Sequence, residues 1–214
     1  MNKIAIFGAG GFGREVKWLI SEINKKDPAW EFIGFFDDDF SKASNIPVNE
    51  QLGGSSILNQ WKEPLKIVFA IGNPVTKKKI ISKISNDKLS FPELIHPNVL
   101  IGHDVSIGAG SIICAGCIIT SNIKIGQHVI LNLGCTVGHD TEIGNYSSFM
   151  PSVNISGEVC CGEGVYTGTG AKIINQLSIG DETTIGAGAV VAKSLPSGCT
   201  AVGVPAKIIR HNPA

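Results

Sequence analysis

Aliphatic residues recur at every sixth position from Ile95 to Val191, with glycines and polar residues between them. Of the seventeen positions in this register, fifteen carry an aliphatic residue or Cys, and the exceptions are Phe149 and Thr167. A period of six fits neither the 3.6-residue period of a helix nor the two-residue period of an ordinary strand. It is typical of a hexapeptide-repeat parallel β-helix, in which three hexapeptides form one coil. We therefore expect roughly five to six stacked coils.

The first 90 residues follow a different pattern, in which short apolar runs alternate with helical periods. Apolar runs predict buried strands at 3–7, 32–36 and 66–71. The spacing of Val16, Leu19, Ile20 and Ile23 predicts an amphipathic helix after the first strand, and a Lys-rich helix at roughly 75–86 follows the third. Such alternation predicts a small parallel α/β sheet. The chain thus divides into a half-Rossmann α/β domain at 1–90 and a β-helix with a C-terminal cap at 91–214.

Charge and cysteine usage narrow the classes of function. The 18 Lys and Arg balance the 18 Asp and Glu, which argues against nucleic acid or an anionic membrane as the main partner. No apolar run approaches the ~20 residues of a membrane span, and no signal-peptide pattern is visible, so we expect a cytoplasmic protein. Cys117 and Cys135 lie eighteen residues apart and are expected to stack as buried thiols. The Cys114-x-x-Cys117 pair lacks partners at zinc-finger spacing, so a metal or redox role is the lesser alternative.

A glycine-rich segment, Gly8-x-Gly10-x-x-Gly13, lies between the first predicted strand and its helix. Glycines let a backbone approach a phosphate, and a helix N-terminus favours negative charge. Asp37 follows the second strand, where a ribose-binding acid is expected. About 90 residues make only half a dinucleotide fold, so we favour a nucleoside diphosphate carrying a sugar over a dinucleotide or a purely structural loop. Lys77 is expected either to reach a phosphate or to lie on a solvated helix face.

Two histidines occupy the same place in the hexad. His103 and His139 each come two residues after a repeat position and point outward, 36 residues or two coils apart. Each is followed by an Asp, and a neighbouring carboxylate orients an imidazole and supports its charged form. His139 is favoured as a general base because it lies in the middle of the β-helix. Gly157, one coil further on, should leave a slot beside its ring.

The combined pattern resembles the bacterial sugar acetyltransferases with a left-handed β-helix, which include UDP-4-amino-sugar N-acetyltransferases and sialic acid O-acetyltransferases. The resemblance rests on the glycine-rich half-Rossmann domain, the hexads, Asn132 seven residues before His139, the His139-Asp140 pair and the closing Gly203-Val204-Pro205-Ala206-Lys207. It covers nearly the whole chain. It implies a homotrimer in which acetyl-CoA, a co-substrate rather than a tightly bound cofactor, lies between adjacent β-helices.

The resemblance also implies roles for individual residues. His139 would be the general base and Asp140 its partner, with no metal involved. The residues that would hold the acceptor nucleotide are Gly10, Gly11, Phe12, Asp37, Asp38 and Gly72. The residues that would contact acetyl-CoA are Ser148, Gly157, Thr169 and Ala187. Among all these site residues, Phe12 and Ser148 depart from the family pattern, because relatives often have His at these two positions.

The predicted reaction is acetyl transfer to the amino group of a nucleotide-linked sugar, for the synthesis of a surface polysaccharide or glycan. O-acetylation of a sialic-acid type is the alternative within the same class. A γ-class carbonic anhydrase would match the spacing of His103 and His139, but its third zinc ligand would fall on Gly144. A non-catalytic protein that binds nucleotide sugars within an assembly complex is the alternative of another class.

Overall fold

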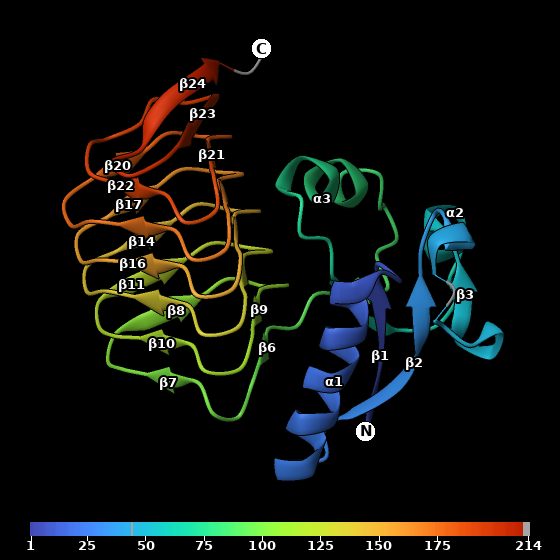
Figure 1. The fold of residues 1–214 in the computed structure, drawn as a ribbon. Coiled ribbons are helices and arrows are strands. Elements are labelled where there is room, and N and C mark those ends of the chain that lie inside the picture. Colours follow the sequence, from blue (N-terminus) through green and yellow to red (C-terminus); the bar gives the residue numbers. More distant parts are fainter. Residues whose placement is uncertain (44, 212–214) are drawn as a thin grey trace.

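The structure, a computed structural model, describes residues 1–43 and 45–211. It contains an amino-terminal α/β domain and a prism of stacked coils that lie side by side (Figure 1). The two predicted parts are both present, and the second is the left-handed parallel β-helix expected from the hexads. The change from one pattern to the other falls between β5 at Leu89–Ser90 and β6 at Leu94–Ile95.

The amino-terminal domain is one parallel sheet with strand order β3-β2-β1-β4-β5 and three helices. Its strands are β1 Asn2–Phe7, β2 Trp30–Phe36, β3 Gln51–Gly53, β4 Leu65–Phe69 and β5. Its helices are α1 Gly11–Lys26, α2 Ser55–Asn59 and α3 Pro74–Ile81, with short 3₁₀ turns at Phe40–Lys42 and Val48–Glu50. The order is that of half a Rossmann fold.

Helix α3 is shorter than the sequence predicts. Asn73 caps its start by accepting a hydrogen bond from the amide of Thr76, and Pro74 occupies the first helical position. The helix ends at Ile81, and the hydroxyl of Ser82 donates to the carbonyl of Lys79. Serine competes for backbone hydrogen bonds at such positions, which the apolar pattern alone does not register.

Three faces form the β-helix, and each is a ladder of parallel strands that lie eighteen residues apart as far as Val191. Face 1 consists of β6, β9 Ile112–Ile113, β12 Ile130–Leu131, β15 Ser148–Phe149, β18 Tyr166–Thr167, β21 Thr184–Ile185, β23 Cys199–Val202 and β24 Lys207–His211. At the end of face 1, β23 pairs with β21 at a spacing of sixteen residues, and β24 is antiparallel. Face 2 consists of β7 Leu100–Ile101, β10 Ile118–Ile119, β13 Thr136–Val137, β16 Asn154–Ile155, β19 Lys172–Ile173 and β22 Val190–Val191. Face 3 consists of β8 Val105–Ile107, β11 Ile123–Ile125, β14 Glu142–Ile143, β17 Cys160–Cys161 and β20 Ser178–Ile179.

The repeat residues point into the prism and form its core, where Ile119, Val137 and Ile155 are almost fully buried. Cys117 and Cys135 are buried there as well, as expected, and both are free thiols. Most turns between faces contain a residue with positive φ, which glycine, Asn and Asp tolerate best; the segments 96–99 and 192–194 do not. Asn122 and Asp140 hold this position between faces 2 and 3.

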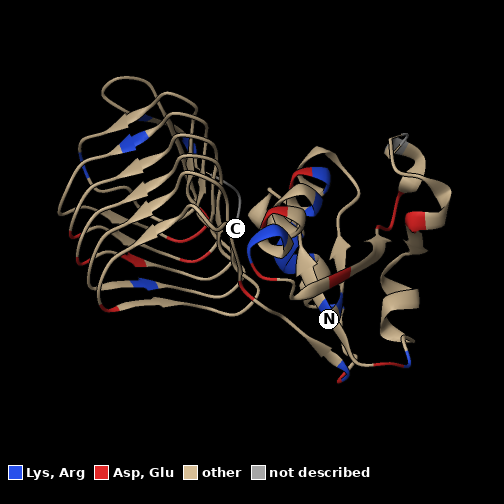
Figure 2. Cartoon of the chain, turned by 90° about the horizontal axis from the view of Figure 1, so that it is seen from below, with Lys and Arg blue, Asp and Glu red and all other residues tan. Residues whose placement is uncertain are grey.

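Face 1 carries the amino-terminal domain. The outward side chains of Leu94, Ile112 and Ile130 on three successive coils join the apolar cluster of helix α1. The domain therefore covers the first coils of this face (Figure 1). Acidic and basic residues are interspersed over both parts of the molecule (Figure 2). None of the described helices is long and apolar enough to cross a membrane.

Candidate active site

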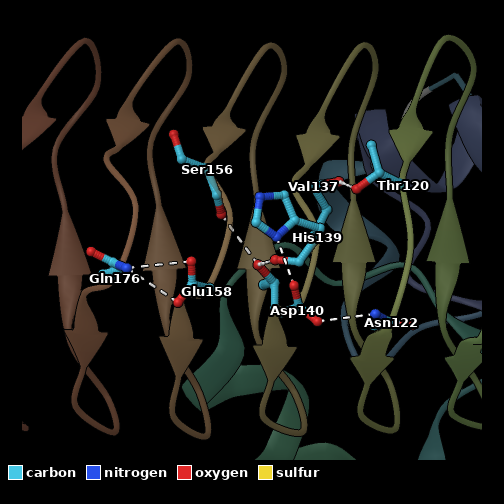
Figure 3. Close-up of polar contacts among 9 residues, drawn as sticks. Thr120, Asn122, Val137, His139, Asp140, Ser156, Glu158 and Gln176 are labelled. Carbon is cyan, nitrogen blue, oxygen red and sulfur yellow. Dashed lines mark hydrogen bonds and ion pairs between the residues drawn. The ribbon is translucent and has the colours of Figure 1, made fainter.

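His139 lies on the corner between faces 2 and 3, in the turn from β13 to β14 (Figure 3). Its Nδ1 is 2.7 Å from Oδ2 of Asp140, and Asn122 donates from Nδ2 to the other oxygen of Asp140 at 3.1 Å. The hydrogen bonds from His139 and from Asn122 lower the pKa of the Asp140 carboxyl. An ionised carboxylate at Nδ1 assigns the ring proton to that nitrogen. Nε2 is then the free acceptor, which is the arrangement a general base requires.

Gly157 forms the next layer of the same corner. A Cβ atom at this position would lie 2.5 Å from Nε2 of His139. The expected space beside the imidazole therefore exists, and the ring fills part of it. More than half of the His139 side chain is exposed, so Nε2 is open to a reactant from outside the chain.

His103 is on the same corner two coils below His139, and it is exposed. Ser121 occupies the coil between them, and position 144 is Gly. Within residues 1–43 and 45–211, no three His, Cys, Asp or Glu side chains gather closely enough to hold a metal ion.

The glycine-rich loop shows which glycines the backbone itself requires. Side chains at Gly8 or Gly13 would collide with backbone oxygens of Ala70 or Gly8, so these two glycines pack strand β1 against its neighbours. At Gly10 a Cβ atom would meet nothing within 4 Å, and at Gly11 it would reach only a distal nitrogen of Arg14. The first turn of α1 therefore presents its unpaired amides on an open surface, which suits a phosphate.

Asp37 is placed beside this loop, as the sequence predicts. Its carboxylate accepts hydrogen bonds from the amide of Ala9 at 2.7 Å and the amide of Asp39 at 2.9 Å. Gly10, Asp37 and Asp39 line a hollow of about 310 Å³ with Ala9 and Ala43. The structure thus brings Gly10 and Asp37 together around a space at the amino-terminal end of α1.

Asp38 and Phe12 both make contacts within the amino-terminal domain. Oδ1 of Asp38 accepts from both the amide and the hydroxyl of Ser55, each at 2.7 Å, and so holds the start of α2. Phe12 is half-buried and packs against the apolar cluster of α1. Acceptor binding by these two side chains therefore stays a prediction.

The loop that precedes α3 meets the β-helix directly. A Cβ atom at Gly72 would lie 3.8 Å from the terminal methyl of Met150, on the corner between faces 1 and 2. Nearby, a cavity of about 480 Å³ separates α3 from face 1; its lining includes Asn73, Tyr166, Thr184 and Arg210. Sequence reasoning missed these lining residues. The signal was available for Tyr166 and Thr184, which stand eighteen residues apart on the outward side of face 1.

Ser148 is not available to a donor in this chain. Its side chain is completely buried, and Nζ of Lys77 lies 2.9 Å from its hydroxyl. Lys77 is itself fully buried, so it neither reaches an open phosphate site nor lies on a solvated helix face. Both expectations for Lys77 were wrong because α3 packs this side of the helix against face 1.

The remaining donor candidates fall on two different corners. Thr169 and Ala187 are exposed on successive coils between faces 1 and 2, whereas Gly157 is between faces 2 and 3. Gly72 lies with the first pair, and His139 lies with Gly157. The candidate residues of a single chain therefore fall into two groups, which face 2 separates.

Comparisons with known proteins agree with this architecture. Residues 3–84 match the family described as PglD N-terminal domain. The whole chain is 33% identical to GDP-perosamine N-acetyltransferase of Escherichia coli O157:H7, with 99% of that relative covered. WeeI from Acinetobacter baumannii has a similar structure with a TM-score of 0.86 and 32% identity, covering 98% of this chain and all of that one. PerB from Caulobacter crescentus, solved with CoA and GDP-perosamine, gives a TM-score of 0.84 and 30% identity over 98% of both chains.

Proposed function

The chain belongs to the hexapeptide-repeat sugar acetyltransferase family and is an acetyl-CoA-dependent N-acetyltransferase of a nucleotide-linked amino sugar; we propose that His139 is its general base. The observation that supports this role is the fixed imidazole. Asp140 holds Nδ1, and Nε2 faces outward over Gly157. We propose that the product enters the synthesis of a surface polysaccharide or glycan.

In the proposed reaction, the neutral amine of the sugar attacks the thioester carbonyl of acetyl-CoA. Nε2 of His139 takes one proton from the attacking nitrogen, and the Asp140 carboxylate stabilises the imidazolium that forms. When the tetrahedral intermediate collapses, the carbon–sulfur bond breaks and the imidazolium returns the proton to the leaving thiolate. The products are the sugar amide and free CoA, and His139 regains its neutral form.

The acceptor would be held by the amino-terminal domain. Its diphosphate would bind the open amides at the start of α1 beside Gly10 and Gly11, and the nucleoside would enter the hollow next to Asp37. We propose backbone contacts at Phe12 and Gly72, and only a supporting role for Asp38, because its carboxylate is engaged by Ser55.

The complete site would form between chains. Gly72, Thr169 and Ala187 lie on or beside the corner between faces 1 and 2, and His139 lies on the next corner. A second chain that places its His139 corner against this edge would unite base, acceptor and donor. We therefore propose a homotrimer with closed threefold symmetry and acetyl-CoA in each groove between neighbouring β-helices. A cytoplasmic location remains a prediction.

The direct test is acetyl transfer to a panel of GDP-, UDP- and dTDP-linked 4-amino sugars, read by mass spectrometry. GDP-perosamine is the first acceptor to test, because a full-length relative acts on it. We expect His139→Ala to lower kcat by about 10² to 10⁴, with both substrates still bound. If the chain bound nucleotide sugars but released CoA with none of them, the result would contradict acetyltransferase activity and favour a non-catalytic sensor.

A further inference from the structure

Lys77 is a buried amine with few partners. Its side chain comes from the first turn of α3 and ends against the β-helix, where Nζ is 2.9 Å from the Ser148 hydroxyl and 3.5 Å from the Ser147 carbonyl. Within residues 1–43 and 45–211 it forms no ion pair. Desolvation lowers the pKa of this amine from 10.5 to about 7.

An apolar side chain would fill this place at less cost. Burying an amine away from water is unfavourable, and two hydrogen bonds recover only part of the loss. Lysine at this position therefore needs a reason other than stability. In helical assemblies, a single buried polar residue is known to select one register among several of similar energy.

Face 1 offers such a choice of registers. Its outward column begins with Leu94, Ile112 and Ile130, all packed against the amino-terminal domain, and continues with Ser148 and then Tyr166. Apolar contact is non-directional, so the first three coils resist sliding weakly. A shift by one coil, about 4.8 Å, would set Nζ of Lys77 opposite an isoleucine or a tyrosine. Of these neighbours, only the small hydroxyl of Ser148 pairs with the amine and leaves room for it.

The ion pair formed by Lys78, the next residue, does not distinguish one register from another. Lys78 lies 2.6 Å from Glu163 and 3.9 Å from Glu182, which belongs to the next coil. Both the amine and the acids are partly exposed, so their attraction is weak and screened. Because an acid recurs one coil further on, Lys78 finds a partner in either register.

We propose that Lys77 is a positioning residue that sets the height of the acceptor-binding loop along the β-helix by its hydrogen bond to Ser148. Gly72 and Asn73 directly precede α3, so their height follows that of the helix. Ser148 begins the coil that follows His139. Its hydrogen bond with Lys77 therefore fixes the position of the acceptor-binding loop along the helix axis relative to His139. This inference rests on the proposed function for its kinetic consequence, although the register itself does not depend on it.

The kinetic test compares Lys77→Met with Lys78→Met on the same helix. We expect Lys77→Met to lower kcat/KM for the nucleotide sugar at least tenfold while KM for acetyl-CoA changes less than twofold. Ser148→Ala should act in the same direction with a smaller effect. Lys78→Met should leave both constants within twofold. The assignment would be overturned if Lys77→Met impaired the kinetic constants for acetyl-CoA as much as those for the nucleotide sugar, or if it impaired neither.

A distance measurement separates the register from the reaction. Nitroxides on Cys160, the exposed cysteine of the described part of the chain, and on Thr76→Cys in α3 report the height of the helix. In oligomers diluted with unlabelled chain, we expect one narrow distance with Lys77 and a broader or shifted distribution with Lys77→Met. An unchanged distribution would refute the register role. If the native chain acetylated no acceptor, the proposed function would fail and this distance would still decide the role of Lys77.

Discussion

The backbone of Gly157 stands directly over the imidazole of His139, so close that a Cβ atom at 157 would lie 2.5 Å from Nε2. The two residues are eighteen apart and occupy successive coils of one corner. The Asp140 carboxylate therefore holds the ring at Nδ1, and the ring lies against the peptide of Gly157, which leaves Nε2 without a hydrogen bond in the described part of the chain. Glycine at 157 therefore makes room for the imidazole as well as for the stacked backbone.

Gly157→Ala should therefore impair catalysis without unfolding the β-helix. The added methyl group must push the His139 ring away from its present place, because the three atoms nearest to it all belong to that ring. We expect kcat to fall by about 10²-fold, the lower range of what general-base catalysis contributes. Steady-state kinetics and the circular dichroism spectrum together check this prediction.

Asn175→Ala is the matched control, because residue 175 is the next member of the same corner column. It changes the surface above Gly157 without approaching the ring, and we expect kcat within twofold of the native value. An equal loss in both variants would mean that the corner as a whole, and not the space at His139, is disturbed.

The register of the β-helix could be predicted from the sequence because its period is strict. One repeat of six assigns each residue to a face or a corner, so the stacking of Gly157 on His139 and the burial of Cys117 and Cys135 follow from counting by eighteen. The same count places His103 two coils away. These relationships depend on one helical parameter and not on how separate elements pack.

The relationships that sequence reasoning missed arise where two elements meet. Lys77 resembles any lysine on a polar helix until α3 is placed against face 1. Ser148 occupies a position where relatives often have His, yet here it is covered by Lys77. Asp38 follows Asp37 in an acidic run, and only the position of α2 shows that its carboxylate is held by Ser55. No periodic pattern encodes these domain contacts.

Asp140→Asn should reduce kcat by roughly 10- to 100-fold. An amide can donate to Nδ1, which would shift the ring proton to Nε2 and block the base. Because Asp140 is about half exposed, we expect a smaller loss than in a buried triad. Substrate KM values should be unchanged in steady-state assays, and an increase in KM alone would contradict the role assigned to Asp140.

Asn122→Ala tests the support of that carboxylate. The variant removes one of the two hydrogen bonds that lower the pKa of Asp140, so this pKa should rise toward its ordinary value of 3.8. A carboxyl with that pKa is still ionised near neutral pH, so activity there should fall less than threefold. Asp140 should take up its proton at a higher pH in the variant than in the native chain. NMR titration of the Asp140 carboxyl carbon in both chains measures this difference, and equal pKa values would contradict the support from Asn122.

Gly10→Asp should separate stability from acceptor binding. Gly10 is the N-cap of α1, with φ of −77° and ψ of −165°, and it has no side-chain cap. Asp is favoured at this position and should stabilise the chain by a few tenths of a kcal/mol. Its charge, however, would occupy the proposed phosphate site, so we expect KM for the nucleotide sugar to rise at least tenfold.

Gly10→Ser is the uncharged control, since serine caps a helix equally well. It should raise the thermal midpoint similarly and weaken the acceptor much less. Calorimetric titration with the nucleoside diphosphate alone gives the same comparison without turnover. Equal affinity for the Asp and Ser variants would show that the diphosphate binds elsewhere.

Mixed oligomers should regain activity if the site is shared between chains. His139→Ala lacks the proposed base, and Gly10→Asp should bind the acceptor at least tenfold more weakly. At acceptor concentrations near the native KM, each homo-oligomer should therefore have little activity. Co-assembled chains would contain junctions that join an intact His139 corner to an intact acceptor domain. We expect recovery of a substantial fraction of native activity after co-expression. Mixtures no more active than their parents would place the whole site within one chain.

Lys77→Met should stabilise the protein, and the gain should depend on pH. In the folded chain the pKa of Lys77 is lowered to about 7 from 10.5, so unfolding takes up a proton between these two values. The native stability therefore rises with pH across this window, and it is lowest relative to the Met variant at pH 7 and below. At pH 10.5 the lysine is neutral in the folded chain and half neutral in the unfolded chain, so the advantage of Met nearly vanishes.

Thermal midpoints at fixed chain concentration measure this difference. We expect Lys77→Met to gain about 5 °C at pH 7 and much less at pH 10. Lys78→Met, whose amine is exposed and paired with Glu163, should show no gain at either pH. A gain that is the same at both pH values would mean that Lys77 is charged in the folded chain throughout. A counter-charge would then hold the lysine, and its burial would carry no stability cost. Such a result would contradict the role of Lys77 in setting the register.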